Sequence, residues 1–190
     1  MLSPRRTERL VLRELVAADG EAFHAFESDP EVVRYMTWGV RSLDEVVRYV
    51  NGCRADAHVE PRRTWELAVV RADDERVIGR TGFNVVHATA DADVHDAVIW
   101  YVLERAAWGH GYAGEAVREL LRVAFADVGV HRAVADVDPR NAPSAKLCER
   151  LGMRREAHFV ENIRIGGDWC DTWIYALLRR EWLARAADAR

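Results

Sequence analysis

Lysine is nearly absent from this chain of 190 residues. Lys146 is the sole lysine among 27 basic residues. Cysteine is scarce as well: Cys53, Cys148 and Cys170 are odd in number, lie far apart and form no CxxC or Cys/His cluster. This pattern excludes a disulfide framework and a structural zinc site. We therefore expect a reduced, cytoplasmic protein that holds no metal ion.

Long apolar runs and an excess of positive charge are missing too. The longest uninterrupted apolar run covers residues 97–103, far short of the roughly 20 residues of a membrane-spanning helix. The first residues lack the apolar core of a signal peptide. The formal net charge is -4, whereas nucleic-acid binders carry a basic surface. Neither a membrane nor a nucleic acid is an expected partner.

The hydrophobic content and the length of the chain are those of one folded domain. Hydrophobic residues make up 49% of the chain, which excludes a disordered segment, and the length predicts one domain over residues 1–190. Arginine binds phosphates in a bidentate manner, so its surplus could indicate a phosphate site. Alanine is abundant as well, and we attribute the arginine surplus mainly to the codon usage of a GC-rich gene.

Hydrophobic periodicity predicts strands interspersed with helices and no internal repeat. Strands are expected at 8–15, 65–70, 76–86, 97–103, 132–137, 154–163 and 171–178. Helices are expected at 19–26, 29–35, 42–57, 112–128 and 143–151. Ser42 and Glu45 form a capping-box pattern at the start of the third helix, and Gly129 ends the fourth. The order predicts a mixed α/β sheet with one strand–helix–strand crossover.

A glycine-rich turn precedes the clearest helix. Gly109, Gly111 and Gly114 spell GxGxxG between a strand and a helix start, where free amides and the helix dipole suit a pyrophosphate. A dinucleotide-binding fingerprint belongs near the start of repeated βαβ units, but this turn lies past the midpoint and one crossover follows it. No GxxxxGK[ST] sequence occurs, which excludes a P-loop.

The surrounding motifs indicate a family. They are TERLVLR at 7–13, DPEVVRY at 29–35, WGHGYAGEA at 108–116, VDPRNAPS at 137–144, LGM at 151–153 and DTWIYALL at 171–178. Together and in this order they resemble the GNAT superfamily of acyl-CoA-dependent N-acetyltransferases, and especially the branch of ribosomal-protein alanine acetyltransferases. The resemblance implies a largely antiparallel sheet of about seven strands with a splayed parallel pair and about four helices. It also implies acetyl transfer from acetyl-CoA to a primary amine, such as a protein N-terminus, by direct attack.

The resemblance implies where the cosubstrate binds. Backbone near Leu103 would pair with pantetheine, and Asn141 would hold it. Ser144 would place a proton or hydrogen bond at the sulfur. The outer phosphate of the nucleotide would lie near Lys146, with Arg140 and Arg150 as further candidates. The pyrophosphate would bind along the turn formed by Trp108, Gly109, His110, Gly111, Tyr112, Ala113 and Gly114.

Catalytic groups are less clearly marked. Many members of the superfamily use a tyrosine as general acid, and this sequence has Cys148 at that position, so a tyrosine-acid mechanism does not carry over to it. Without a histidine partner, Cys148 is expected to be an apolar filler rather than a nucleophile. For the general base we rank Glu104 first, because it ends the splayed strand, and Asp136 second.

Acceptor recognition is expected from Trp38, Glu27 and His95. The segment that also carries Asp91, Asp93 and Asp96 is a solvated loop that could attract a cationic amine. Two alternatives to a protein N-terminus stay open: a small amine (an amino sugar, polyamine or amino acid), and a module that binds acyl-CoA without catalysis. Homodimers are common in the family, so a homodimer is possible.

Overall fold

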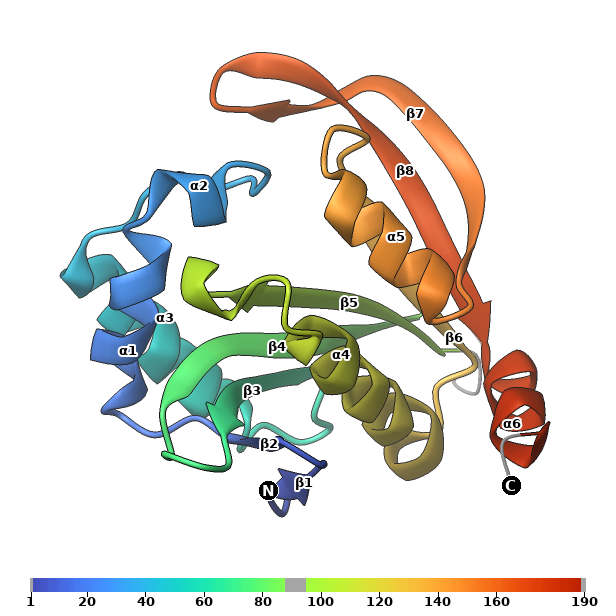
Figure 1. Cartoon of the computed structure of the whole chain (residues 1–190), viewed down its shortest axis with the longest axis horizontal. Helices are drawn as coiled ribbons and strands as arrows, with labels where there is room; N and C mark the ends of the chain where they lie inside the picture. Colours follow the sequence, from blue (N-terminus) through green and yellow to red (C-terminus); the bar gives the residue numbers. More distant parts are fainter. Residues whose placement is uncertain (1, 88–94, 189–190) are drawn as a thin grey trace.

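The computed structural model describes residues 2–87 and 95–188. Its centre is one eight-stranded sheet in the order β1-β2-β3-β4-β5-β6-β8-β7 (Figure 1). All neighbours pair antiparallel except β5 and β6, which are parallel. The strands are β1 (Arg5–Arg6), β2 (Leu10–Glu14), β3 (Thr64–Arg71), β4 (Val77–His87), β5 (His95–Leu103), β6 (Arg132–Val137), β7 (Arg154–Ile165) and β8 (Asp168–Leu178).

Helices cover both faces of this sheet (Figure 1). They are α1 (Asp19–Glu27), α2 (Pro30–Val33), α3 (Leu43–Asp56), α4 (Tyr112–Arg122), α5 (Ala142–Arg150) and α6 (Arg179–Asp188). A 3-10 turn, η1 (Arg105–Ala107), precedes α4, and a π-helical segment, η2 (Val123–Val128), follows it. Within the described residues, no helix has the length and apolarity that a membrane span requires.

Two hydrophobic clusters fix the layers. The larger one packs α4 and α5 onto one face of the sheet, around residues such as Leu120, Phe125 and Leu147. The smaller one packs α1 and α3 onto the other face, around Phe23 and Val46. Side chains alternate along a strand, so odd-numbered residues of β5 face the first layer and even-numbered ones face the second.

The sheet is split where its two parallel strands diverge. Pairing between β5 and β6 covers Asp96↔Arg132, Ala97↔Ala133 and Val98↔Val134, and no residue beyond these is paired in the described chain. Both strands continue past this point, to Leu103 and Val137. This is the splayed parallel pair that the family resemblance implies, and it lies at the centre of the fold.

The predicted fold class is confirmed. The Ser42–Glu45 capping box is present, and Gly129 ends the helical run in a left-handed conformation (φ 82°). The sheet has one strand more than expected, because β1 is too short to show a periodic pattern. The predicted helix over 112–128 changes to π-helical geometry after Arg122. The C-terminal helix α6 was missed, because its arginine-rich sequence has little amphipathic pattern.

Candidate active site

The split exposes backbone groups of β5. The amide of Glu104 donates to the carbonyl of Ile78 on β4 at 2.9 Å. Backbone groups of an antiparallel strand point alternately to its two sides, so those of Tyr101 and Leu103 point away from β4, toward the gap. Both residues lie beyond the last residue paired with β6. The gap therefore offers a strand edge to an extended ligand such as pantetheine, with the backbone of Tyr101 and the amide of Leu103 unpaired within the described chain.

The glycine-rich turn lies next to this edge and presents its amides. Gly109 and Gly111 have φ values of 79° and 82°, which non-glycine residues rarely adopt. Within the described chain, none of the six amides from Gly109 to Gly114 donates to a protein acceptor. They stand at the positive end of α4. The indole Nε1 of Trp108 donates to the carbonyl of Leu103 at 2.9 Å and ties the turn to β5.

The N-terminal segment braces the same turn. Glu115 accepts hydrogen bonds from the Thr7 hydroxyl (2.5 Å), the Arg9 amide (2.7 Å) and the Arg9 side chain (2.8 Å). Arg9 also donates to the carbonyl of His110 (2.9 Å) and lies over the Tyr112 ring. Burial alone would raise the pKa of Glu115, but the hydrogen bonds from Thr7 and Arg9 outweigh it and lower the pKa. Thr7 and Arg9 thus hold Glu115 at the start of α4, and we call this contact between two distant motifs the clasp.

A pair of hydroxyl groups lies between β5 and α5. The Tyr101 hydroxyl is 2.5 Å from the Ser144 hydroxyl, and burial raises the pKa of the Tyr101 phenol. Asn141 caps α5, because its side-chain oxygen accepts from the Ser144 amide at 3.2 Å. Sequence analysis selected Asn141 and Ser144 but missed Tyr101. Only the alternation of β5, which turns odd-numbered residues toward α5, could have indicated it.

Cys148 lies on the same helix but is closed off. Its side chain is 1% exposed, and burial raises the pKa of the thiol to about 12. The thiol is therefore protonated near neutral pH and fills space in the core.

The two candidate bases have different surroundings. The Glu104 carboxylate accepts a hydrogen bond from Arg76 at 2.5 Å, so this carboxylate is already paired with a guanidinium. Asp136 has no hydrogen bond or ion pair within the described chain, and partial burial raises its pKa. Asp136 lies two residues beyond Val134 on β6, as Trp100 lies two beyond Val98 on β5. Asp136 and Trp100 therefore share one face of the split sheet.

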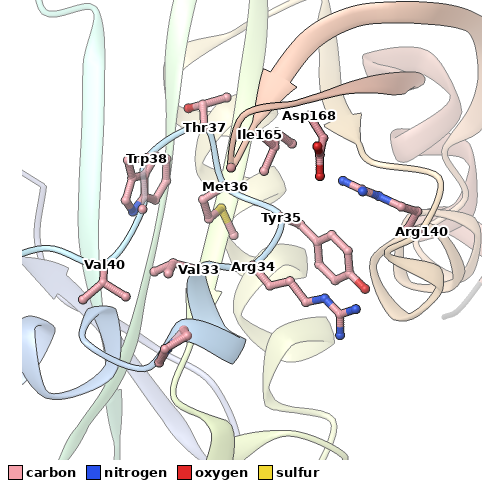
Figure 2. A pocket seen from close by; sticks show the side chains of 13 residues that line it. Val33, Arg34, Tyr35, Met36, Thr37, Trp38, Val40, Arg140, Ile165 and Asp168 are labelled. Atoms are coloured by element: carbon pink, nitrogen blue, oxygen red, sulfur yellow. The ribbon is translucent and has the colours of Figure 1, made fainter.

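A cavity of about 500 Å³ lies between the segment around α2 and the β7–β8 turn. Its walls come from α2, residues 34–40, Arg140 and the β7–β8 turn (Figure 2). Trp38, predicted to contact the acceptor, lines this cavity. Its ring stacks against the guanidinium groups of Arg41 and Arg80, at 4.6 and 5.2 Å. Arg140, a candidate for the outer phosphate, also lines the cavity.

Glu27 is not part of the cavity wall. It is fully buried, and it binds Arg80 at 2.7 Å and Arg41 at 3.1 Å. Arg80 is buried too and also bonds Glu66 and the Tyr49 hydroxyl. We call this group of residues the buried charge cluster (Glu27, Arg41, Tyr49, Glu66 and Arg80). Its two arginines contact the Trp38 ring. Glu27 therefore reaches an acceptor only through its neighbours.

The other predicted residues are more scattered. His95 begins β5, at the opposite end from Leu103, so the structure does not bring it to Trp38. Asp96 lies 3.6 Å from Arg132, and Asp91 and Asp93 fall outside the described residues. Lys146 is exposed on α5.

Comparisons with known proteins agree with this geometry. The family model of the acetyltransferase (GNAT) domain matches residues 9–154. An uncharacterized N-acetyltransferase of Bacillus licheniformis is 33% identical over 180 residues, which cover 93% of this chain and 96% of that protein. The ribosomal-protein-uS5-alanine N-acetyltransferase of Escherichia coli is 29% identical over 111 residues, 58% of this chain and 55% of that protein.

The fold has a solved counterpart. The crystal structure of a GNAT-family acetyltransferase from Bacillus anthracis superposes with a TM-score of 0.81 at 28% identity, covering 94% of this chain and all of that one. The matched domain, the split parallel pair and the unpaired amides of the glycine turn lead to one conclusion: this chain belongs to the GNAT family of acyl-CoA-dependent N-acetyltransferases.

Proposed function

We propose that the chain transfers the acetyl group of acetyl-CoA to the primary amine of a small molecule by direct attack. The observation that carries the proposal is the unpaired edge of β5 beside six unbonded amides. Pantetheine extends along Tyr101 and Leu103, and the pyrophosphate binds the amides from Gly109 to Gly114. The side-chain NH2 of Asn141, whose oxygen is used by the cap, donates to a pantetheine amide.

Proton transfer at the sulfur is assigned to the hydroxyl pair. When the amine nitrogen bonds to the carbonyl carbon and the C–S bond breaks, the thiolate takes a proton from Ser144. Tyr101, hydrogen-bonded to Ser144, supplies the replacement proton. Tyr101 then regains a proton through water, which carries the proton that the nitrogen loses when it becomes an amide. The amide of Leu103 points toward the gap and stabilises the negative charge that develops on the carbonyl oxygen. This arrangement does not need a tyrosine at position 148.

We assign the general base to Asp136 rather than Glu104. A base must be free to accept the proton of the attacking ammonium, directly or through water. Asp136 is unpaired within the described chain and desolvation raises its pKa above the usual range of an aspartate, whereas Glu104 is bound by Arg76. This order reverses the ranking derived from sequence.

The size of the cavity favours a small acceptor. About 500 Å³ is within the range of roughly 300–1,000 Å³ typical of small-molecule sites. A protein N-terminus is the second candidate, supported by the similarity to the ribosomal-protein alanine acetyltransferase. A module that binds acyl-CoA without catalysis is the third possibility, and the same assay distinguishes it.

The test is a panel of small amines and peptides with acetyl-CoA and detection of the released thiol. We expect turnover with a subset of small amines, and Gly111→Asp should abolish acetyl-CoA binding by placing a carboxylate among the phosphate-binding amides. Gly129→Asp is the matched control, because Gly129 has the same φ of 82° but ends η2. Binding without any turnover would indicate the non-catalytic module, and turnover of peptides alone would indicate a protein substrate.

A further inference from the structure

The cavity wall has more arginine side chains than acidic ones. Of its 13 lining residues, two are arginines, Arg34 and Arg140, and one is acidic, Asp168. The remaining lining residues are uncharged. The buried carboxylate of Asp138 neutralises Arg140. Arg34 makes no hydrogen bond to a carboxylate within the described chain, and its guanidinium would repel the positive charges of a polyamine. The wall is suited to a molecule that brings a negative charge of its own.

The two arginines converge on one aromatic ring. The Arg34 guanidinium carbon lies 5.4 Å from the Tyr35 ring centroid, and that of Arg140 lies 5.9 Å from it. Figure 2 shows the two guanidinium groups on different sides of this ring. Tyr35 therefore lies between the two guanidinium groups, and both groups border the cavity around its ring.

Both guanidinium groups keep donors for a ligand. Arg34 has a single charged neighbour among the described residues, Glu31 at 3.7 Å, and makes no hydrogen bond to it. Arg140 uses Nε and Nη2 on Asp138 and Cys170, which leaves its Nη1 unbonded within the described chain. These contacts fix Arg140 in place without using all of its donors.

We propose that the acceptor is a primary amine that also carries an oxyanion, a carboxylate or a phosphate, bound by Arg34 and Arg140 beside Tyr35. The carbon skeleton of the acceptor packs on apolar wall residues such as Val33 and Met36, and its amine extends toward the split. The inference rests on the proposed function and specifies its substrate class. Amino acids and phosphorylated amino sugars fit this class, whereas polyamines do not.

The test compares amines that differ only in the anion. Phenylalanine is paired with phenylalaninamide, and glucosamine 6-phosphate with glucosamine; spermidine is the polycation. We expect the anionic member of at least one pair to have the higher kcat/KM, and the pair affected distinguishes a carboxylate from a phosphate. In Arg34→Gln, KM for that member should rise about 10- to 100-fold, the usual effect of losing a hydrogen bond to a charged group.

Two further variants make the result specific. Arg140→Gln should act in the same direction, although it also frees the buried Asp138, so Arg34→Gln is the cleaner variant. Arg180→Gln removes an exposed arginine from α6, far from the cavity (Figure 1), and should leave every KM unchanged. KM for acetyl-CoA should stay constant in all three variants.

Several results would overturn the inference. They are a preference for spermidine or the neutral amines, an anion preference that survives in both cavity variants, or a rise in KM for acetyl-CoA, which would assign the arginines to the cosubstrate. A protein that binds acetyl-CoA and acetylates no member of the panel would overturn it as well. Failure to bind acetyl-CoA at all would instead refute the proposed function.

Discussion

Replacing Tyr101 with phenylalanine tests the proton path directly. The change removes one hydroxyl, 2.5 Å from that of Ser144, and keeps the ring that fills the space between β5 and α5. A hydrogen bond between neutral groups contributes about 0.5–1.5 kcal/mol to stability, so the melting temperature should fall by roughly 1–6 °C. General acid catalysis contributes about 10²–10⁴-fold in rate, so kcat should fall far more than stability predicts.

Tyr175→Phe is the matched control for this variant. The Tyr175 hydroxyl also bonds to α5, through Glu149 at 3.1 Å, but it lies outside the gap. Both variants should lose similar stability in thermal unfolding, and Tyr101→Phe alone should lose kcat with KM for acetyl-CoA unchanged. In a double-mutant cycle, Tyr101→Phe and Ser144→Ala should be strongly non-additive, because they interrupt one path.

The reasoning would be refuted by equal behaviour of the two tyrosine variants. If Tyr101→Phe keeps full kcat and loses only the stability that Tyr175→Phe loses, the hydroxyl pair is a structural link between β5 and α5. If Ser144→Ala lowers kcat and Tyr101→Phe does not, Ser144 acts alone and its proton comes from water.

Three further predictions concern charged groups. Asp136 has a raised pKa, so activity should fall as pH drops below that pKa, and Asp136→Asn should remove this acid limb of the pH–rate profile along with most of kcat. Because an acid with a raised pKa costs the native state stability as pH rises through it, Asp136→Asn should melt no lower than the parent at neutral pH. Arg80→Gln leaves the buried Glu27 and Glu66 without their shared guanidinium and should cost about 3–5 kcal/mol in denaturant unfolding. Glu115→Gln weakens the clasp on the glycine turn and should raise KM for acetyl-CoA more than it lowers kcat in steady-state assays.

Each of these predictions has a result that would contradict it. An unchanged acid limb in Asp136→Asn would return Glu104 to first place as the base. A neutral effect of Arg80→Gln would mean that water reaches the buried charge cluster. Glu119→Gln is the control for Glu115→Gln, since Glu119 pairs with Arg122 on the same helix away from the turn; equal effects of both would reduce the clasp to general helix stability.

The sequence predicted those structural features that depend on residues close together in the chain. The capping box at Ser42 and the stop at Gly129 each depend on residues within about two helical turns. Family motifs supplied the splayed pair, which no periodicity could give. The partner of Ser144 could not be predicted in this way, because Tyr101 belongs to another element and meets it only through the crossover of β5, α4 and β6.

The clasp on the glycine turn could not be predicted from local sequence either. Glu115 reads as an ordinary first-turn acid that favours the helix dipole, and TERLVLR reads as a strand start. Their contact, from Thr7 and Arg9 to Glu115, depends on where β2 lies beside α4 in the folded sheet. The TERLVLR motif therefore also holds the backbone of the glycine turn, whose amides we propose to bind the pyrophosphate.

The acceptor cavity differs from the cosubstrate site in how its parts are held. In the function that we propose, amides and strand edges bind the cosubstrate. The backbone fold would then determine that site, and Trp108 holds the glycine turn against β5. The cavity wall instead comes from α2 and the loop after it, from Arg140 and from the β7–β8 turn, which lie far apart in sequence. Substitutions at Arg34 or Tyr35 can change the acceptor without disturbing the gap. A shared fold therefore fixes the acetyl donor, and the choice of amine must be derived from the charges of each protein's own cavity.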